Sequence, residues 1–125
     1  MKPAVRFVNP LPLVANLAAS ITFYRDVVGL SVVEETADFV RFDTGFALHD
    51  GASLLAQALG AQPLGTPFGR ENLVLYCETD DLDAAYAWIA PRAAIVHAIR
   101  RMAWGGRVFR FRDIDGHIVE MGEPS

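Results

Sequence analysis

The chain runs one short pattern twice, and the two copies lie about 65 positions apart. In each copy an apolar stretch leads through a short polar hinge into a helix-like run, over residues 8–24 in the first and 73–88 in the second. Extended segments follow both runs and end at residues 45–49 and 116–120. A repeat of this size indicates two half-domains that close around one shared cleft. The residues at matching positions of the two halves therefore decide which chemistry is possible.

The first half predicts the order strand, helix and three more strands. Asn16 is a suitable N-cap, and Gly29 is placed to end the helix that follows it. Pro10 and Pro12 cannot donate to a strand ladder, so the opening strand has to lie on an edge or be irregular there. The helix carries apolar residues at positions 17, 21, 24 and 28. The strands that we expect are residues 5–13, 32–35, 39–42 and 46–49.

The second half repeats this order. Its helix begins after Asp80 or Asp81 and runs to about residue 89, with Pro91 beyond its end. Residues 113–116, Asp-Ile-Asp-Gly, have the composition of a hairpin turn between the last two strands. The strands that we expect are residues 71–78, 94–99, 107–112 and 117–121.

A connector rich in Gly, Ala and Pro joins the halves over residues 51–70. Leu54, Leu55 and Leu59 predict one or two helical turns in it, and a connector this long often forms part of a binding wall. We therefore expect an α+β fold in a single domain over residues 1–125. It has a βαβββ module at about residues 1–50, the connector, and a second βαβββ module at about residues 71–125.

Composition narrows the function classes. The hydrophobic fraction is 52% and the charged fraction 21%, as in an ordinary globular protein. The net charge is −4, with no basic block beyond Arg100-Arg101, which argues against nucleic-acid binding. No apolar run approaches the ~20 residues of a membrane span, and no signal region precedes the first strand, so we expect a cytoplasmic protein. Cys77 is the only cysteine, and strand alternation predicts a buried, unreactive thiol.

Residues 23–30 (FYRDVVGL) and 111–120 (FRDIDGHIVE) resemble the helix end and the terminal hairpin of the vicinal-oxygen-chelate superfamily, with Ile114 in place of the usual proline. That superfamily includes glyoxalase I, bleomycin-resistance proteins, fosfomycin-resistance enzymes and extradiol dioxygenases. The match spans nearly the whole chain and is nearest to small uncharacterised glyoxalase-like members. It implies two βαβββ modules forming a cupped eight-stranded mixed sheet, with helices on the outer face. It also implies a dimer, with the ligand in the cup.

In metal-dependent members, the resemblance places ligands on the first and fourth strands of each module, here at Asn9, Val74, His49 and Glu120. His49 and Glu120 are good ligands, Asn9 offers only a neutral carbonyl oxygen, and Val74 offers none. The set is incomplete for Zn, Ni, Mn or Fe. We therefore expect no cofactor, with a divalent metal held by His49 and Glu120 as the alternative.

His49 and Glu120 are also the catalytic candidates that the resemblance points to. An imidazole titrates near neutrality, and a neighbouring carboxylate holds its tautomer. Two structural alternatives stay open. His49 can be a core histidine whose ring is satisfied by Glu120 or a backbone group, and Glu120 can form a structural ion pair with Arg110 or His49.

Further residues are candidates for ligand binding, each with a structural alternative. Arg110 can bind an anionic or carbonyl-bearing ligand bidentately, or can be the counter-ion of Glu120. Trp104 can stack on a planar ligand or pack over the cup. Structural roles are the alternatives for His97 and Tyr76, and His117 beside the turn is expected to be solvated. The ligand-binding set is Asn9, Tyr76, His97, Trp104 and Arg110.

These residues favour the recognition of a small planar or carbonyl-containing molecule in the cleft between the modules. The first alternative is a metal-dependent lyase or isomerase of the glyoxalase I type, and the second is a structural dimer with a vestigial pocket. The partners that we expect are a small-molecule ligand and a second copy of the chain, with neither nucleic acid nor membrane.

Overall fold

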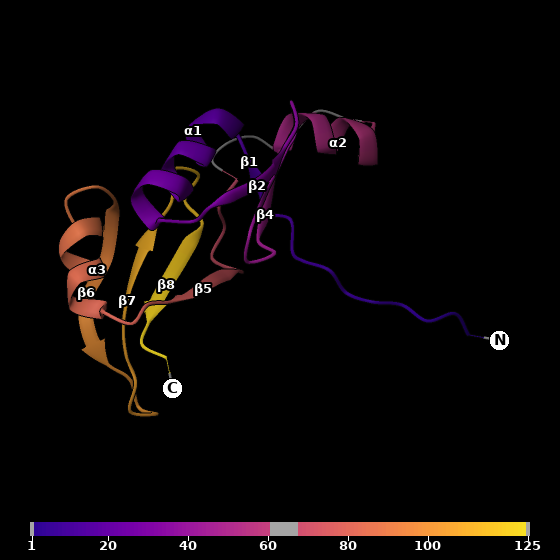
Figure 1. Ribbon diagram of the computed structural model, residues 1–125. Coiled ribbons are helices and arrows are strands. Elements are labelled where there is room, and N and C mark those ends of the chain that lie inside the picture. The colour runs from indigo at the N-terminus through magenta and orange to yellow at the C-terminus, as the bar shows by residue number, and fades with distance from the viewer. Residues whose placement is uncertain (1, 61–67, 125) are drawn as a thin grey trace.

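The computed structural model describes residues 2–60 and 68–124. Figure 1 shows the helices packed around the strands, with α1 between the strands of the first module and those of the second. The first module consists of β1 (Leu13–Val14), α1 (Leu17–Thr22), the π-helical turn η1 (Phe23–Val28), β2 (Val32–Glu35), β3 (Phe39–Phe42) and β4 (Ala47–Asp50). The connector contains α2 (Gly51–Leu59). The second module consists of β5 (Val74–Glu78), α3 (Leu82–Ile89), β6 (Ala94–Arg101), β7 (Arg107–Arg112) and β8 (Ile118–Gly122).

The two modules have the same strand order. The first sheet runs β1-β4-β3-β2 and the second β5-β8-β7-β6. In each, the first strand pairs in parallel with the fourth, and the remaining pairs are antiparallel. The predicted α+β fold of two βαβββ modules is confirmed. The eight strands form two separate four-stranded sheets rather than a closed barrel.

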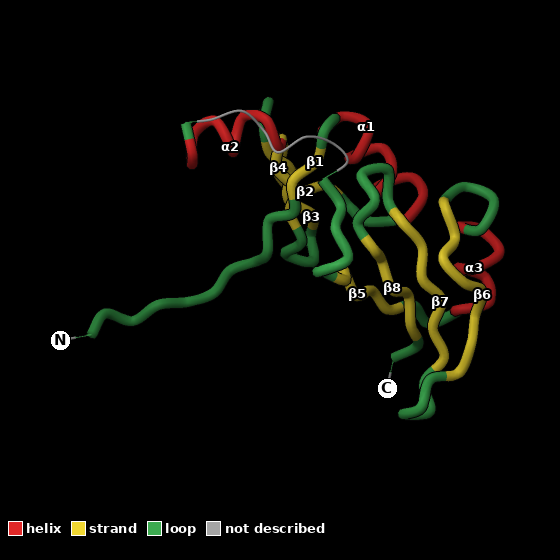
Figure 2. Tube along the Cα trace, turned by 180° about the vertical axis from the view of Figure 1, so that it is seen from behind, coloured by secondary structure: helices red, strands yellow, loops and turns green. Residues whose placement is uncertain are grey.

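The opening strand is much shorter than the predicted residues 5–13. Only Leu13–Val14 pairs with β4, because Pro10 and Pro12 bring no N–H group to the ladder. Residues 2–8 are exposed and extend away from both sheets, as Figures 1 and 2 show from opposite sides. The chain therefore begins with an arm that its own sheets do not take up.

The predicted helix of the first module forms as α1 and η1. The side chain of Asn16 accepts a hydrogen bond from the Ala19 amide, and Gly29, with φ at 97°, ends the helix as predicted. The amides of Gly29 and Leu30 both donate to the carbonyl of Tyr24. In the connector, the predicted turns form as α2, with Asp50 as its N-cap. The part of the connector over residues 61–67 lies outside the described residues.

Helices cover one face of each sheet. In the second module, Leu82 and Ile89 of α3 are 2% exposed, and the ring of Tyr86 meets Phe109 of β7 edge-on at 5.1 Å. In the first, α1 and η1 pack on Val40, Phe42 and Leu48. Figure 2 looks onto the other face of the second sheet, with α3 behind it. Among the described residues, no helix is long and apolar enough to cross a membrane.

Buried polar groups join the modules to each other. The Tyr24 hydroxyl donates to Oδ2 of Asp113 at 2.5 Å. Oδ1 of Asp115 accepts from the Ala15 amide at 2.8 Å. The prediction that His117 is solvated is wrong, because it is 6% exposed and its Nε2 donates to the carbonyl of Leu13 at 2.8 Å. Buried hydrogen bonds therefore anchor the hairpin turn between β7 and β8 to the first module.

Candidate functional site

Four of the predicted residues stand in one row across the second sheet. Tyr76 on β5 is paired in register with Glu120 on β8, Glu120 with Arg110 on β7, and Arg110 with His97 on β6. Residues paired in this way share a face of a sheet, and this face is the one that α3 leaves open. The alternating period of the strands is what brings the four side chains together.

Arg110 is the centre of this row. Its Nε and Nη2 lie 2.8 Å from Oε1 of Glu120, and its Nη1 lies 2.9 Å from Nε2 of His97. Nδ1 of His97 lies 2.8 Å from the carbonyl oxygen of Ala98. A carbonyl only accepts, so Nδ1 carries the ring proton and Nε2 accepts from Arg110. The histidine is thus the neutral partner that fixes the guanidinium from the side opposite Glu120.

The ion pair is largely shielded from water. The side chain of Arg110 is 23% exposed and that of Glu120 is 14% exposed. This is the structural ion pair named as an alternative for both residues. It still leaves capacity for a ligand, because within the described residues no hydrogen bond reaches Oε2 of Glu120, and one Nη1 hydrogen of Arg110 is also unpaired.

Several large apolar and aromatic side chains of the second module are exposed. Val74 and Tyr76 are 49% and 54% exposed on β5, and Trp104 is 67% exposed in the turn between β6 and β7. The Tyr76 hydroxyl donates to Glu78 at 2.9 Å, and this hydrogen bond is the main reason why the pKa of Tyr76 is raised. On the open face, Tyr76 thus places an exposed aromatic ring in the same row as the shielded charge pair.

His49 lies on the other sheet. The turn before β4 and the turn before β8 contain the same pattern of backbone hydrogen bonds. Counted from these turns, His49 and Glu120 occupy matching positions, as the sequence predicted. Nδ1 of His49 lies 2.9 Å from the carbonyl of Asp50, and its ring lies 6.4 Å from that of Phe39. Within the described part of the chain, no hydrogen bond or ion pair joins His49 to Glu120.

The possible metal-ligating side chains of the described residues are not arranged to bind a divalent metal. Across residues 2–60 and 68–124, no three His, Cys, Asp or Glu side chains are grouped so as to hold an ion. Glu120 already pairs with the guanidinium of Arg110, whose positive charge would oppose a cation at the same carboxylate.

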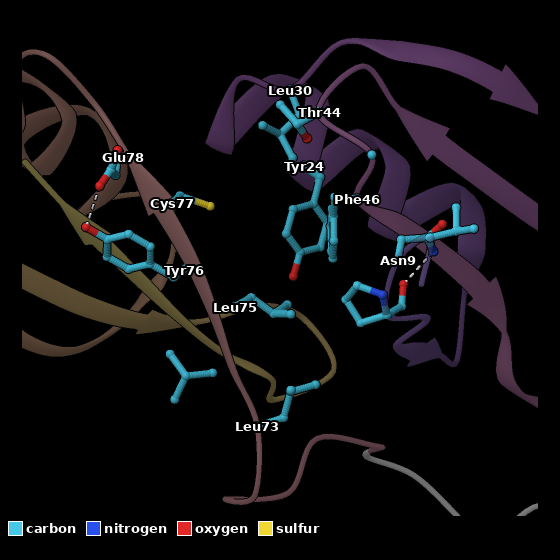
Figure 3. Close-up of a pocket in the computed structure, with 14 residues that line it drawn as sticks. Asn9, Tyr24, Leu30, Thr44, Phe46, Leu73, Leu75, Tyr76, Cys77 and Glu78 are labelled. Carbon is cyan, nitrogen blue, oxygen red and sulfur yellow. Dashed lines mark hydrogen bonds between the residues drawn. The ribbon is translucent and has the colours of Figure 1, made fainter. Parts of the chain in front are cut away.

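An apolar groove of about 630 Å³ separates the modules. Figure 3 shows Tyr24 and Phe46 on one wall and β5 on the other, with the sulfur of Cys77 directed into it and Tyr76 and Glu78 turned away. Of the predicted site residues, only Asn9 and Tyr76 line this groove. Asn9 donates to the carbonyl of Pro10 at 2.7 Å. Burial raises the pKa of the Cys77 thiol to about 11, which agrees with the unreactive thiol predicted.

The buried hydrogen bonds of Tyr24, Asp113, Asp115 and His117 between the modules were not predicted from the sequence. Burial, followed by the charge of Asp113, raises the pKa of Tyr24 well above its ordinary value, and burial also raises that of Asp115. All four residues belong to the two motifs that carry the family resemblance. The signal available was that both motifs contain polar residues that no candidate site used.

Residues 7–125 match the sequence model of the Glyoxalase-like domain. The chain belongs to this family. The membership supports the vicinal-oxygen-chelate assignment made from the two motifs. No curated protein matches the chain.

Solved structures agree with this membership. A protein of unknown function from Agrobacterium tumefaciens str. C58 is 45% identical, with 99% of this chain and 98% of that one covered and a TM-score of 0.94. Lactoylglutathione lyase from Agrobacterium tumefaciens is 25% identical, with 97% and 95% covered and a TM-score of 0.71. A glyoxalase/bleomycin resistance protein/dioxygenase from Nocardioides is 21% identical, with 98% and 85% covered and a TM-score of 0.75, and shows the shared fold.

Proposed function

We propose that this glyoxalase-like protein binds a small planar organic molecule on the open face of the β5–β8 sheet, without a resident metal. The observation that carries the proposal is the Arg110–Glu120 pair. The pair is shielded from water, and His97 accepts from the guanidinium on the side away from Glu120. Among the described residues, one Nη1 hydrogen of Arg110 and Oε2 of Glu120 have no hydrogen-bond partner.

The spare groups define the chemistry of the ligand. The remaining Nη1 hydrogen of Arg110 donates to a carbonyl oxygen, and Oε2 of Glu120 accepts from a neighbouring hydroxyl or N–H group. A carboxamide or an α-hydroxycarbonyl compound presents both groups side by side. Tyr76 and Trp104 supply the aromatic surfaces for a planar body.

A thermal-stabilisation screen of aromatic carboxamides and α-hydroxyketones tests the proposal. Compounds that stabilise the protein are expected to lose at least about tenfold in affinity in Glu120→Gln, which keeps the size of the side chain but removes its charge. Glu34→Gln is the matched control, because Glu34 pairs with Arg41 on the other sheet at 3.2 Å. An equal loss in both variants, or no stabilising compound in the panel, would contradict a ligand site at Glu120 and favour a vestigial pocket.

Metal analysis separates this proposal from a metal-dependent lyase or isomerase, the alternative suggested by the likeness to lactoylglutathione lyase. Protein purified without chelator is expected to contain no stoichiometric Zn, Ni, Mn or Fe. Near-stoichiometric metal that disappears in His49→Ala and in Glu120→Ala would overturn the metal-free reading.

A further inference from the structure

Arg100 on β6 is a basic residue of the second sheet that the proposed ligand site does not use. Its side chain is exposed, and among the described residues it has no hydrogen bond or ion pair. The other arginines of this sheet each donate to an oxygen atom of the protein, and they are Arg101, Arg107, Arg110 and Arg112. The donors of Arg100 are therefore available to a molecule from outside.

Two irregularities in β6 direct His97 and Arg100 to the open face of the sheet. In a regular strand, residues two positions apart share a face and residues three apart do not. The register shifts between Ile95 and His97, and shifts again between His97 and Arg100. As a result His97 pairs with Arg110, and Arg100 pairs with Val108. Irregularities of this kind redirect side chains and are frequent beside functional sites.

The neighbours of Arg100 along the strand agree with this orientation. Ile99 packs against the hydrophobic core, so strand alternation turns Arg100 away from the core. Arg101 pairs with Arg107, whose guanidinium donates to Asp83 of α3 on the covered face. Figure 2 shows β6 beside β7 at the border of the open face. Arg100 therefore stands on the open face, between two residues that face the helix.

Arg100 is the diagonal neighbour of Arg110 on this face. It pairs with Val108, which precedes Arg110 by two positions on β7. Such diagonal neighbours lie about 7–8 Å apart, which is within reach of long side chains. Glu120 neutralises Arg110 and pairs with it on the opposite side, on β8. Two guanidinium groups and one carboxylate therefore gather here, and the positive charge of Arg100 has no counter-ion among the described residues.

The row of the sheet that contains Arg100 has no acidic residue nearby. Val108 pairs with Gly122, and Gly122 pairs with Glu78 on β5. Three strand spacings separate Glu78 from Arg100, or about 14 Å. The carboxylate of Glu78 also accepts from the hydroxyl of Tyr76, whose ring lies over Gly122, because a Cβ there would come 2.9 Å from that hydroxyl oxygen. Between Arg100 and Glu78 this row carries no charged side chain.

Arg110 has too few free donors to hold an anion by itself. Its Nε and Nη2 are directed at Glu120, and Nη2 also lies 3.8 Å from the sulfur of Met102. Its Nη1 donates to His97, so one N–H group remains. A carboxylate or phosphate is held best by two parallel N–H groups of one guanidinium. Arg110 suits a carbonyl oxygen, whereas an anionic group needs the free guanidinium of Arg100.

The surroundings of Arg100 are basic although the protein is acidic. Residues 84–112 contain six arginines and neither Asp nor Glu, whereas the whole chain has a net charge of −4. A local excess of one sign of charge raises the concentration of oppositely charged small molecules at the surface. The side of the sheet formed by β6 and β7 therefore favours an anionic ligand.

We propose that Arg100 binds an anionic group, a carboxylate or a phosphate, of the small molecule whose carbonyl oxygen Arg110 holds. The inference rests on the proposed function, since it states the charge of that ligand. The molecule bound on the open face is then a carbonyl-containing organic anion. Arg100 is the residue that selects it over neutral compounds of the same shape.

Calorimetric titration with three related compounds tests the role of Arg100. The compounds are 3-carbamoylbenzoate, its uncharged methyl ester and 3-carbamoylphenyl phosphate, which share one aromatic carboxamide. At low ionic strength the wild type is expected to bind the two anions at least about fivefold more tightly than the ester. Arg100→Gln is expected to abolish this advantage and to leave the affinity for the ester unchanged. Arg101→Gln is the matched control, because it removes the same charge from the covered face at the next position and is expected to keep the advantage.

Binding of the ester separates this inference from the proposed function. An ester that binds as tightly as both anions would overturn the role of Arg100 and leave the ligand site in place. The same holds for an advantage that survives Arg100→Gln, or that is lost equally in Arg101→Gln. If none of the three compounds binds, the proposed function and the inference both fail. An advantage of one anion alone supports the inference and distinguishes a carboxylate from a phosphate.

Discussion

The hydroxyl of Tyr24 donates to Asp113, and the two residues are 1% and 5% exposed. Replacing Tyr24 with Phe removes the hydroxyl. Among the described residues, the buried Asp113 carboxylate then keeps only the hydrogen bonds from the backbone amides of Asp115 and His117. We expect Tyr24→Phe to lower the free energy of unfolding in urea by about 1–3 kcal/mol. Tyr86→Phe is the control, because among the described residues the Tyr86 hydroxyl has no hydrogen bond, and an equal loss in both would contradict the prediction.

The raised pKa of Tyr24 predicts that the protein loses stability at high pH. Burial raises the pKa of Tyr24 well above 10.0, the value expected in the unfolded chain. Below that pH the group is protonated in both states and adds no pH dependence. Above it the unfolded chain releases a proton that the folded chain retains, so stability falls as pH rises. Urea unfolding between pH 9 and 11 is expected to show a smaller fall in Tyr24→Phe than in the wild type.

Individual residues differ in how far the sequence could place them. Tyr76, His97, Arg110 and Glu120 were grouped as site candidates, and they stand together because strands alternate with a fixed period of two. His117 was expected in water because it stands beside a turn. Its burial depends on how the second module meets β1, a contact between residues 104 positions apart that local pattern does not reveal.

The N-terminus of α3 offers a test at the level of one element. The sequence left Asp80 and Asp81 as alternative caps, and the structure assigns the role to Asp81, whose side chain accepts from the Ala84 amide at 3.0 Å. We expect Asp81→Ala to destabilise the protein by about 0.5–2 kcal/mol in urea unfolding, the usual cost of losing an N-cap. Asp80→Ala, one residue earlier and exposed, is expected to leave stability nearly unchanged. The assignment would be wrong if the two losses were reversed.

Helices and antiparallel hairpins were the elements that sequence predicted best. Caps, turn glycines and periodicity are local, so α3, β2, β3 and β7 lie where they were expected. β1 did not, since a strand needs a partner as well as a pattern. Pro10 and Pro12 limit its pairing to Leu13–Val14, and the apolar residues before them remain on the arm.

At the scale of the whole molecule, buried hydrogen bonds connect the two modules. Asp115 of the last hairpin accepts hydrogen bonds from Ala15 and Ser20 of the first module. Burial raises the pKa of Asp115, and the hydrogen bonds from Ala15 and Ser20 act against that rise because they favour the ionised carboxylate. The family repeat explains why each module folds as it does, and we expect contacts of this kind to make the two modules unfold together.

Asp115→Ala is expected to uncouple the modules during unfolding. The substitution leaves the Ala15 amide and the Ser20 hydroxyl without their acceptor, at a cost of about 1–3 kcal/mol. Both tryptophans, Trp88 and Trp104, belong to the second module, so fluorescence reports that module while far-ultraviolet circular dichroism reports both. In the wild type the two urea transitions are expected to coincide, and in Asp115→Ala they are expected to separate. Asp43→Ala alters the corresponding turn of the first module at an exposed position and is expected to keep the transitions together. Coincident transitions in Asp115→Ala would show that apolar contacts alone couple the modules.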